Sequence, residues 1–178
     1  MEKLCHAILW ILEKSSQGRN RIDLAKLLYF SDGVCFQKHA KMITDSVYIH
    51  LDDSPYPIAL NEALLHLKKQ GHIDAVPLIT AQGIQCFQLR FVSAIPGLVL
   101  SKEEKRIMMK VVEAFRSKVV DESRHYPNLY ENYVVTPLFE EIPFAIDRIN
   151  TKIHVLVQKS LLQLSGKMFR VLFERSGE

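Results

Sequence analysis

The sequence has few cysteines and none of the paired spacings that bind zinc or form a redox motif. Cys5, Cys35 and Cys86 lie far apart in a chain of 178 residues. An odd number of well-separated cysteines argues against a disulfide framework. We therefore expect reduced thiols, buried as small apolar side chains, in a cytoplasmic protein.

Long apolar runs and a strong excess of one charge are also missing. No run approaches the roughly 20 apolar residues that a membrane span needs. The first segment, MEKLCHAILWILEKSS, has an acidic residue at position 2 and no small-residue cleavage site, so we expect a helix and not a signal peptide. The net charge is only +3, which permits a nucleic-acid partner without requiring one.

The usual signatures of catalysis and of cofactor binding are absent as well. The seven glycines form no phosphate-binding loop, and neither a G-x-S-x-G nor an H-E-x-x-H motif occurs. His39, Asp45, His50, Asp52 and Asp53 are close in sequence, but their spacing matches no zinc site. We predict no catalytic residues, no metal site and no cofactor, and hence a protein that is not an enzyme.

Helical periodicity and capping residues dominate what is present. Apolar residues recur at helical spacing over residues 2–15, and Asn20 is placed to cap a second helix. Gly33, in the middle of that helix, costs about 1 kcal/mol relative to alanine, which indicates a helix break or a close backbone approach. Asp32 beside it is expected to satisfy local backbone or a neighbouring tyrosine. Ser101 and Glu104 form a capping box that begins a later helix.

Strand patterns separate these helices. Alternation over Val47–Leu51 predicts a short strand, and the DDSPYP segment that follows predicts a turn whose prolines exclude regular helix until after Pro57. A third helix comes next and ends before Gly71. Segments 73–79 and 84–92 then predict a β-hairpin.

The last part of the chain reads as a long loop around Tyr126, a long helix from about Pro143 to Leu164 and a final strand over 169–173. The fold class is therefore α+β and mainly α-helical: winged-helix-like helices with a small β-hairpin, followed by a long C-terminal helix. We expect a single domain, in which residues 131–178 form a helical extension that packs on the core of residues 1–130.

Two sets of residues are candidates for binding. Tyrosines in turns and loops suit protein contacts, because they add contact area at small entropic cost; these are Tyr48, Tyr56, Tyr126 and Tyr130. The alternative is that these rings cover the long C-terminal helix. A basic set could contact nucleic acid, with Lys68 and Lys69 at the end of the third helix and Arg90 in the hairpin. Glu62 on the same helix would oppose phosphate.

The stretch IDLAKLLYFSDGVCFQKHAKMITDS resembles the first half of the Panacea domain, the SocA-like antitoxin family. The matching residues are KLLYF and Asp32 in a helix, then Lys41 and Thr44. The segments SPYPIALNEALLHLKKQGHI, LSKEEKRIMMKVVEAF and ESRHYPN correspond to later parts of the family pattern. Ser54 stands where the family has a glycine before proline. The resemblance covers roughly residues 5–130.

This resemblance implies a non-catalytic protein-binding module whose partner is a cognate toxin. The module would neutralise the toxin by direct contact or act as an adaptor for its proteolysis. The order helix, helix, strand, helix, hairpin is also that of a winged-helix unit, in which the third helix reads DNA. A winged-helix DNA-binding regulator is therefore the alternative, although fold alone does not fix function.

Overall fold

The computed structural model describes residues 1–79, 85–97, 99–116 and 122–144. Within these ranges the helices and strands follow in the order α1 (Glu2–Lys14), α2 (Arg21–His39), β1 (Tyr48–Leu51), β2 (Ser54–Pro57), α3 (Leu60–Lys69), β3 (Ile73–Ile79), β4 (Gln85–Phe91), α4 (Lys102–Ala114), α5 (Glu122–His125) and α6 (Pro127–Val135). The strands form two small antiparallel sheets, β1–β2 and β3–β4. This mixture of helices and small sheets confirms the α+β class.

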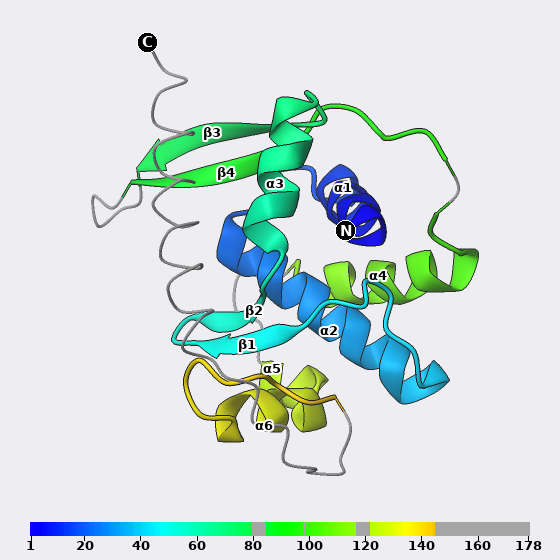
Figure 1. The fold of residues 1–178 in the computed structure, drawn as a ribbon, viewed down its shortest axis with the longest axis vertical. Helices are drawn as coiled ribbons and strands as arrows, with labels where there is room; N and C mark the ends of the chain where they lie inside the picture. Colours follow the sequence, from blue (N-terminus) through cyan, green and yellow to red (C-terminus); the bar gives the residue numbers. More distant parts are fainter. Residues whose placement is uncertain (80–84, 98, 117–121, 145–178) are drawn as a thin grey trace.

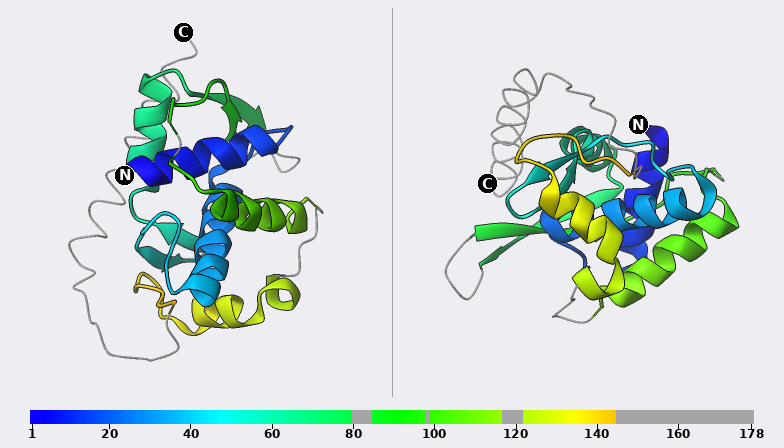
Figure 2. Two further views of the ribbon diagram at one scale, coloured as in Figure 1. Left: turned by 90° about the vertical axis from the view of Figure 1, so that its right-hand side faces the viewer. Right: turned by 90° about the horizontal axis from the view of Figure 1, so that it is seen from below.

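Helix α2 lies at the centre of the molecule. Figures 1 and 2 show it running from α1, α3 and the β3–β4 hairpin at one end to α5 and α6 at the other. Its side chains from Leu24 to Gly33 are nearly all buried. The predicted cap is confirmed, because the Asn20 side chain accepts a hydrogen bond from the backbone N–H of Asp23. A helix buried on almost every face organises the core around itself.

The sheet β1–β2 forms where the sequence predicts a strand and then only a turn. Pro55 lies opposite His50 and Pro57 opposite Tyr48. Both prolines are tolerated because the backbone of β1 at these positions bonds to residues 139–142 on its other edge: His50 donates to Glu140 and accepts from Phe139, and Tyr48 accepts from Ile142. Since Pro55 and Pro57 face residues whose backbone groups point away from β2, their missing N–H groups leave no gap in the ladder.

The predicted hairpin is confirmed as β3–β4, with Ile73 opposite Phe91 and Pro77 opposite Phe87. The turn between α1 and α2 adds to it, since Arg19 and Leu89 exchange backbone hydrogen bonds of 3.0 and 2.8 Å. Gly18 before this pairing has φ +74°, and a Cβ atom there would lie 2.4 Å from the carbonyl oxygen of Leu89. Glycine is required at this position by both the backbone conformation and the close approach.

The capping box of α4 is also confirmed, with Ser101 and Glu104 bonded reciprocally. The predicted loop around Tyr126 is wrong in part, because α5 and α6 occupy residues 122–125 and 127–135 and leave only Tyr126 between them. Pro127 takes the first position of α6, where its missing N–H costs nothing. The close approach expected at Gly33 is found here: a Cβ atom on it would lie 2.5 Å from Cδ2 of Leu129 in α6.

Several predictions fall outside the described residues. These are the turn of the hairpin, most of the long C-terminal helix and the final strand over 169–173. The packing of residues 131–178 as an extension of the same domain stays a prediction. In the described ranges, no helix has the length and apolar character to span a membrane.

Candidate partner-binding site

Asp32 belongs to the helical stretch that resembles the Panacea domain, and the rest of the protein encloses its side chain completely. Its carboxylate accepts hydrogen bonds from the backbone N–H groups of Ile43 (2.7 Å) and Thr44 (2.9 Å), from the Thr44 hydroxyl, and from the Tyr48 hydroxyl (2.7 Å). The side chain is fully buried. Burial raises the pKa of Asp32 above its usual range, while these four hydrogen bonds oppose the rise.

These hydrogen bonds to Asp32 hold the segment that follows α2 against the helix. The Thr44 hydroxyl, whose one proton goes to Asp32, also accepts a hydrogen bond from the backbone N–H of Ser46 at 3.3 Å. Tyr48 begins β1, so one carboxylate fixes the path of the chain from α2 into the first sheet. The prediction that Asp32 satisfies a tyrosine is confirmed, whereas the backbone N–H groups that it accepts from are not local, since they lie 11 and 12 residues further along the chain. All the hydrogen-bond partners of Asp32 given above lie inside the protein, so the role of this network is structural.

Two of the four tyrosines expected to contact a partner are inside the protein. Tyr48 is 1% exposed and Tyr56 is 4% exposed. Tyr48 packs edge-on against Tyr29 at 5.3 Å between ring centroids, while the Tyr56 hydroxyl donates to Asn61 and Arg21 lies over its ring. Burial raises the pKa of Tyr56 to about 12, although Arg21 lowers it. Their burial is evidence against direct contact with a partner.

The other two tyrosines lie nearer the surface. Tyr126 is half-buried and stacks on Phe30, with ring centroids 4.9 Å apart. Tyr130 is half-buried on α6, and its nearest ring is that of Tyr133 at 6.5 Å. Tyr133 donates to the carbonyl of Leu51 at 2.8 Å and so holds α6 against β1. Tyr130 is therefore the tyrosine with the most freedom to meet another protein.

Exposed apolar residues continue from Tyr130 along and beyond α6. Val134 is 52% exposed, Val135 is 55% exposed and Leu138 is 41% exposed. Tyr130 and Val134 are four residues apart on a helix, so they lie on one face. We call Tyr130, Val134, Val135 and Leu138 the α6 patch. Of these four residues, the sequence pattern pointed only to Tyr130, because the exposure of an aliphatic side chain depends on which elements pack beside it.

The three basic residues expected to contact nucleic acid are not free of acidic neighbours. Asp74 pairs with Arg90 in the β3–β4 register. Lys68 is half-buried, and its pKa is lowered by that burial while the charge of Asp74 opposes the change. Lys69 and Arg90 are exposed. The three basic residues lie together at one end of the molecule, but the carboxylate of Asp74 offsets part of their positive charge.

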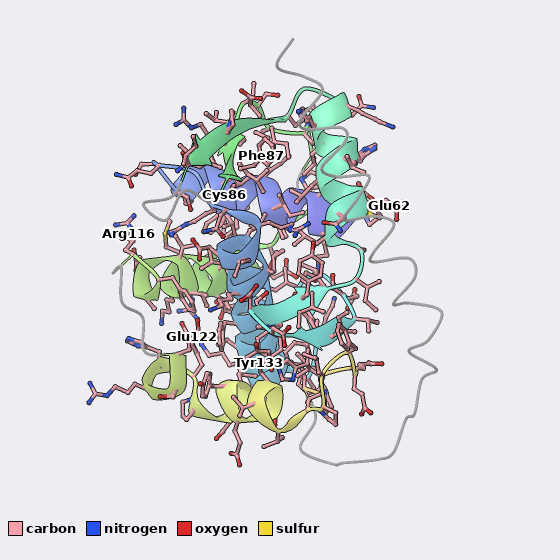
Figure 3. All side chains as sticks on the ribbon, turned by 90° about the vertical axis from the view of Figure 1, so that its left-hand side faces the viewer. Glu62, Cys86, Phe87, Arg116, Glu122 and Tyr133 are labelled. Atoms are coloured by element: carbon pink, nitrogen blue, oxygen red, sulfur yellow. The ribbon has the colours of Figure 1, made fainter. Side chains whose placement is uncertain are left out.

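A concavity of about 620 Å³ lies near the start of α2, and we call it the hairpin groove. Its walls are the turn between α1 and α2, the first turn of α2, strands β3 and β4, and Arg116 just after α4. Figure 3 shows Cys86 of β4 and Arg116 on the same edge of the molecule. Of the basic residues near the start of α2, Lys14 and Arg19 line the groove. The sequence could not reveal that Arg116 joins them.

The described ranges contain no group of three or more histidine, cysteine or acidic side chains that could hold a metal ion. Cys5 and Cys35 are buried thiols whose pKa is raised by burial. A raised pKa keeps a thiol protonated and a poor nucleophile.

The family model for the antitoxin SocA-like, Panacea domain matches residues 24–124. The chain belongs to this family. The match begins in α2, covers the Asp32 network, both sheets and α4, and ends within α5, so the Panacea domain contains the buried anchor of the fold. The α6 patch lies beyond it. No curated protein and no solved structure matches the chain.

Proposed function

We propose that this protein is a non-catalytic, antitoxin-like binding module whose partner is a toxin protein. The observation that carries the proposal is the Panacea family match over residues 24–124. The module would neutralise the toxin by direct contact or deliver it to a protease as an adaptor. Both mechanisms need a stable protein–protein contact and no chemistry by this chain.

The α6 patch is the proposed contact surface. Apolar side chains that lie together on an exposed face contribute most to binding when a partner removes them from water. Tyr130 supplies the aromatic anchor typical of such contacts. Tyr126, stacked on Phe30, supports α6 from beneath and contacts the partner at most along its exposed edge.

The test is co-expression with the product of the adjacent gene, followed by capture and a wash at high salt. A one-to-one complex that relieves the toxicity of that product supports the proposal, because an apolar contact persists when ionic contacts are screened. No complex with a product that is harmless on expression would contradict it. Growth in the presence and absence of the host's ATP-dependent proteases then separates neutralisation by contact from delivery for proteolysis.

The surface itself is tested with a matched pair of substitutions. Val134→Asp places a charge in the α6 patch, whereas Val92→Asp places one on an equally exposed valine beyond β4, since the two are 52% and 56% exposed. We expect Val134→Asp to weaken capture about tenfold or more, and Val92→Asp to leave it unchanged. Equal effects of the two variants would remove the α6 patch as the contact surface.

A DNA-binding regulator is the second candidate, and the connection of its elements favours it. The backbone pairing of Arg19 with Leu89 joins the turn between α1 and α2 to the hairpin, next to α3, in the order of a winged-helix unit. This candidate predicts affinity for duplex DNA that falls steeply between about 50 and 200 mM salt. Replacing Lys68 and Lys69 with alanine should reduce that salt dependence, and Arg90→Ala should weaken binding further.

A further inference from the structure

The hairpin groove carries a charge that neither the Panacea family nor the proposed function explains. Among the described residues, three cations line it, Lys14, Arg19 and Arg116, against one carboxylate, Asp23. These cations come from two separate parts of the chain, the end of α1 with the turn that follows it and the residue Arg116, and the fold gathers them around one concavity. The described part of the lining therefore has a net charge of +2, in a chain whose whole net charge is +3.

Asp23, the carboxylate that lines the described part of the groove, is hydrogen-bonded within its own helix turn. Asp23 accepts a hydrogen bond of 3.0 Å from the side-chain amide of Asn20. It also lies in the first turn of α2, where the positive end of the helix dipole stabilises a negative charge. Asp23 therefore stays negatively charged and offsets one of the three positive charges of the described lining, which leaves a surplus of two for a ligand.

The cations have donor capacity left for a ligand. Arg19 donates from Nε to the Ser15 hydroxyl at 3.1 Å, which orients the guanidinium and leaves its terminal N–H groups available. Lys14 pairs with Glu13 at 3.3 Å, but both side chains are more than a third exposed, so this contact is weak. In the described ranges, Arg116 takes part in no ion pair.

The remaining walls suit a peptide backbone. Gln88 donates from its side-chain amide to the carbonyl of Gln17, which ties β4 to the turn and places amide groups beside the cations. Phe87 and Leu78 add apolar surface. A volume of about 620 Å³ has room for a few residues of an extended segment. Duplex DNA instead needs a continuous basic stripe along its backbone.

We propose that the hairpin groove binds an acidic segment of the partner protein, with carboxylates held by Lys14, Arg19 and Arg116. This inference rests on the proposed function, since it assigns the partner a second point of contact. Carboxylate–guanidinium pairing is geometrically specific and steers association. The apolar α6 patch would hold the complex at high salt, while the groove sets the partner's orientation and speeds its approach.

The first test uses the full chain and a fluorescein-labelled deca-glutamate peptide, with deca-glutamine as the uncharged control. Binding is followed by fluorescence anisotropy. We expect the acidic peptide to bind and the double variant Lys14→Glu/Arg116→Glu to raise its Kd about tenfold or more, because like charges then face each other. The control variant Lys102→Glu/Lys110→Glu changes net charge equally at exposed positions of α4 outside the groove.

The results of these binding measurements either support or overturn the hairpin groove as the site of the acidic peptide. Equal loss in both double variants, or no binding of deca-glutamate, would overturn the groove as the site. Tighter binding of a labelled dT10 oligonucleotide, lost through the same groove variant, would assign the groove to nucleic acid and overturn the peptide assignment. Circular dichroism of each variant confirms that the fold is retained.

A second measurement separates this inference from the proposed function. The groove variant and its control are each mixed with the captured partner, and association is timed by stopped-flow fluorescence. Slower association of the groove variant alone supports the inference, whereas equal rates contradict it and leave the antitoxin proposal standing. Conversely, a chain that captures no toxin but binds deca-glutamate through the groove would sustain the inference and contradict the proposed function.

Discussion

The middle and the beginning of α2 differ in the environment of their polar side chains, which are buried in the middle and line an open groove at the beginning. In the middle, Asp32 is fully buried and every hydrogen-bond partner belongs to the same chain. At the beginning, Asn20 and Asp23 line an open concavity together with cations from other elements. A polar group enclosed by its own partners stabilises one fold, whereas polar groups around a groove retain capacity for a ligand. The same helix thus anchors the protein and presents a surface.

Among the substitutions that test this comparison, removal of the buried Asp32 carboxylate should have the largest effect on the stability of the protein. Asp32→Ala leaves the N–H groups of Ile43 and Thr44 and the hydroxyl of Tyr48 without an acceptor inside the protein. We expect a loss of about 3–5 kcal/mol in the free energy of unfolding, measured by urea denaturation. Asp32→Asn keeps an acceptor for the backbone donors and should cost less. A loss below that of the exposed control Asp53→Ala would contradict the anchoring role.

The next effect is steric and concerns the neighbouring residue. Gly33→Ala would gain about 1 kcal/mol in helix propensity, but its Cβ would lie 2.5 Å from a methyl carbon of the buried Leu129. We expect a net destabilisation of about 1–2 kcal/mol, since overpacking outweighs the gain. A double-mutant cycle with Leu129→Ala should show that the substitution at Gly33 is less harmful once the leucine is shortened. Additive losses would place the cost elsewhere.

At the open end of α2, the cap should matter less. Asn20→Ala removes the acceptor for the Asp23 N–H, and the expected loss is about 1 kcal/mol. Asn20→Ser restores a capping hydroxyl and should recover most of it, as judged by thermal unfolding. If serine fails to rescue, the contribution of Asn20 comes from its side-chain bond to Asp23 rather than from the cap.

The smallest effect on stability is expected in the groove. Arg116→Glu changes an exposed side chain without an ion pair in the described ranges, so the free energy of unfolding should shift by less than about 0.5 kcal/mol. Peptide binding by the same variant should weaken. A large loss of stability would show that Arg116 supports the fold, and would remove the contrast between the two ends of the helix.

Local features were predictable where a few neighbouring residues decide them. The cap at Asn20 and the capping box at Ser101 follow from helix chemistry within one turn. Gly33 indicated a helix break or a close approach, and the tertiary structure decided between them by placing Leu129 of α6 beside it. The role of Asp32 was foreseen in kind, because a carboxylate among apolar helix residues needs donors close by. Its actual donors lie 11 to 16 residues away, and the path of the chain after α2 brings them together.

The tyrosines illustrate what sequence patterns could not decide. A tyrosine has an apolar ring and a polar hydroxyl, so the same residue suits a core or a surface. Tyr48 is buried because Asp32 accepts its hydroxyl and Tyr29 covers its ring. Tyr130 remains near the surface because no comparable acceptor faces it in the described ranges. The environment of the ring, set by distant segments, made the difference.

The sequence by itself determined helices α1 to α4, the caps at Asn20 and Ser101, the β3–β4 hairpin and membership of an antitoxin-like family, because these depend on periodicity and on residues close in the chain. The tertiary structure alone decided that Pro55 and Pro57 could sit in a strand, since residues 139–142 take the hydrogen bonds on the other edge of β1. It also decided that Lys14, Arg19 and Arg116 share one groove. Such arrangements join residues far apart in sequence, and only packing brings their charges and backbone groups together.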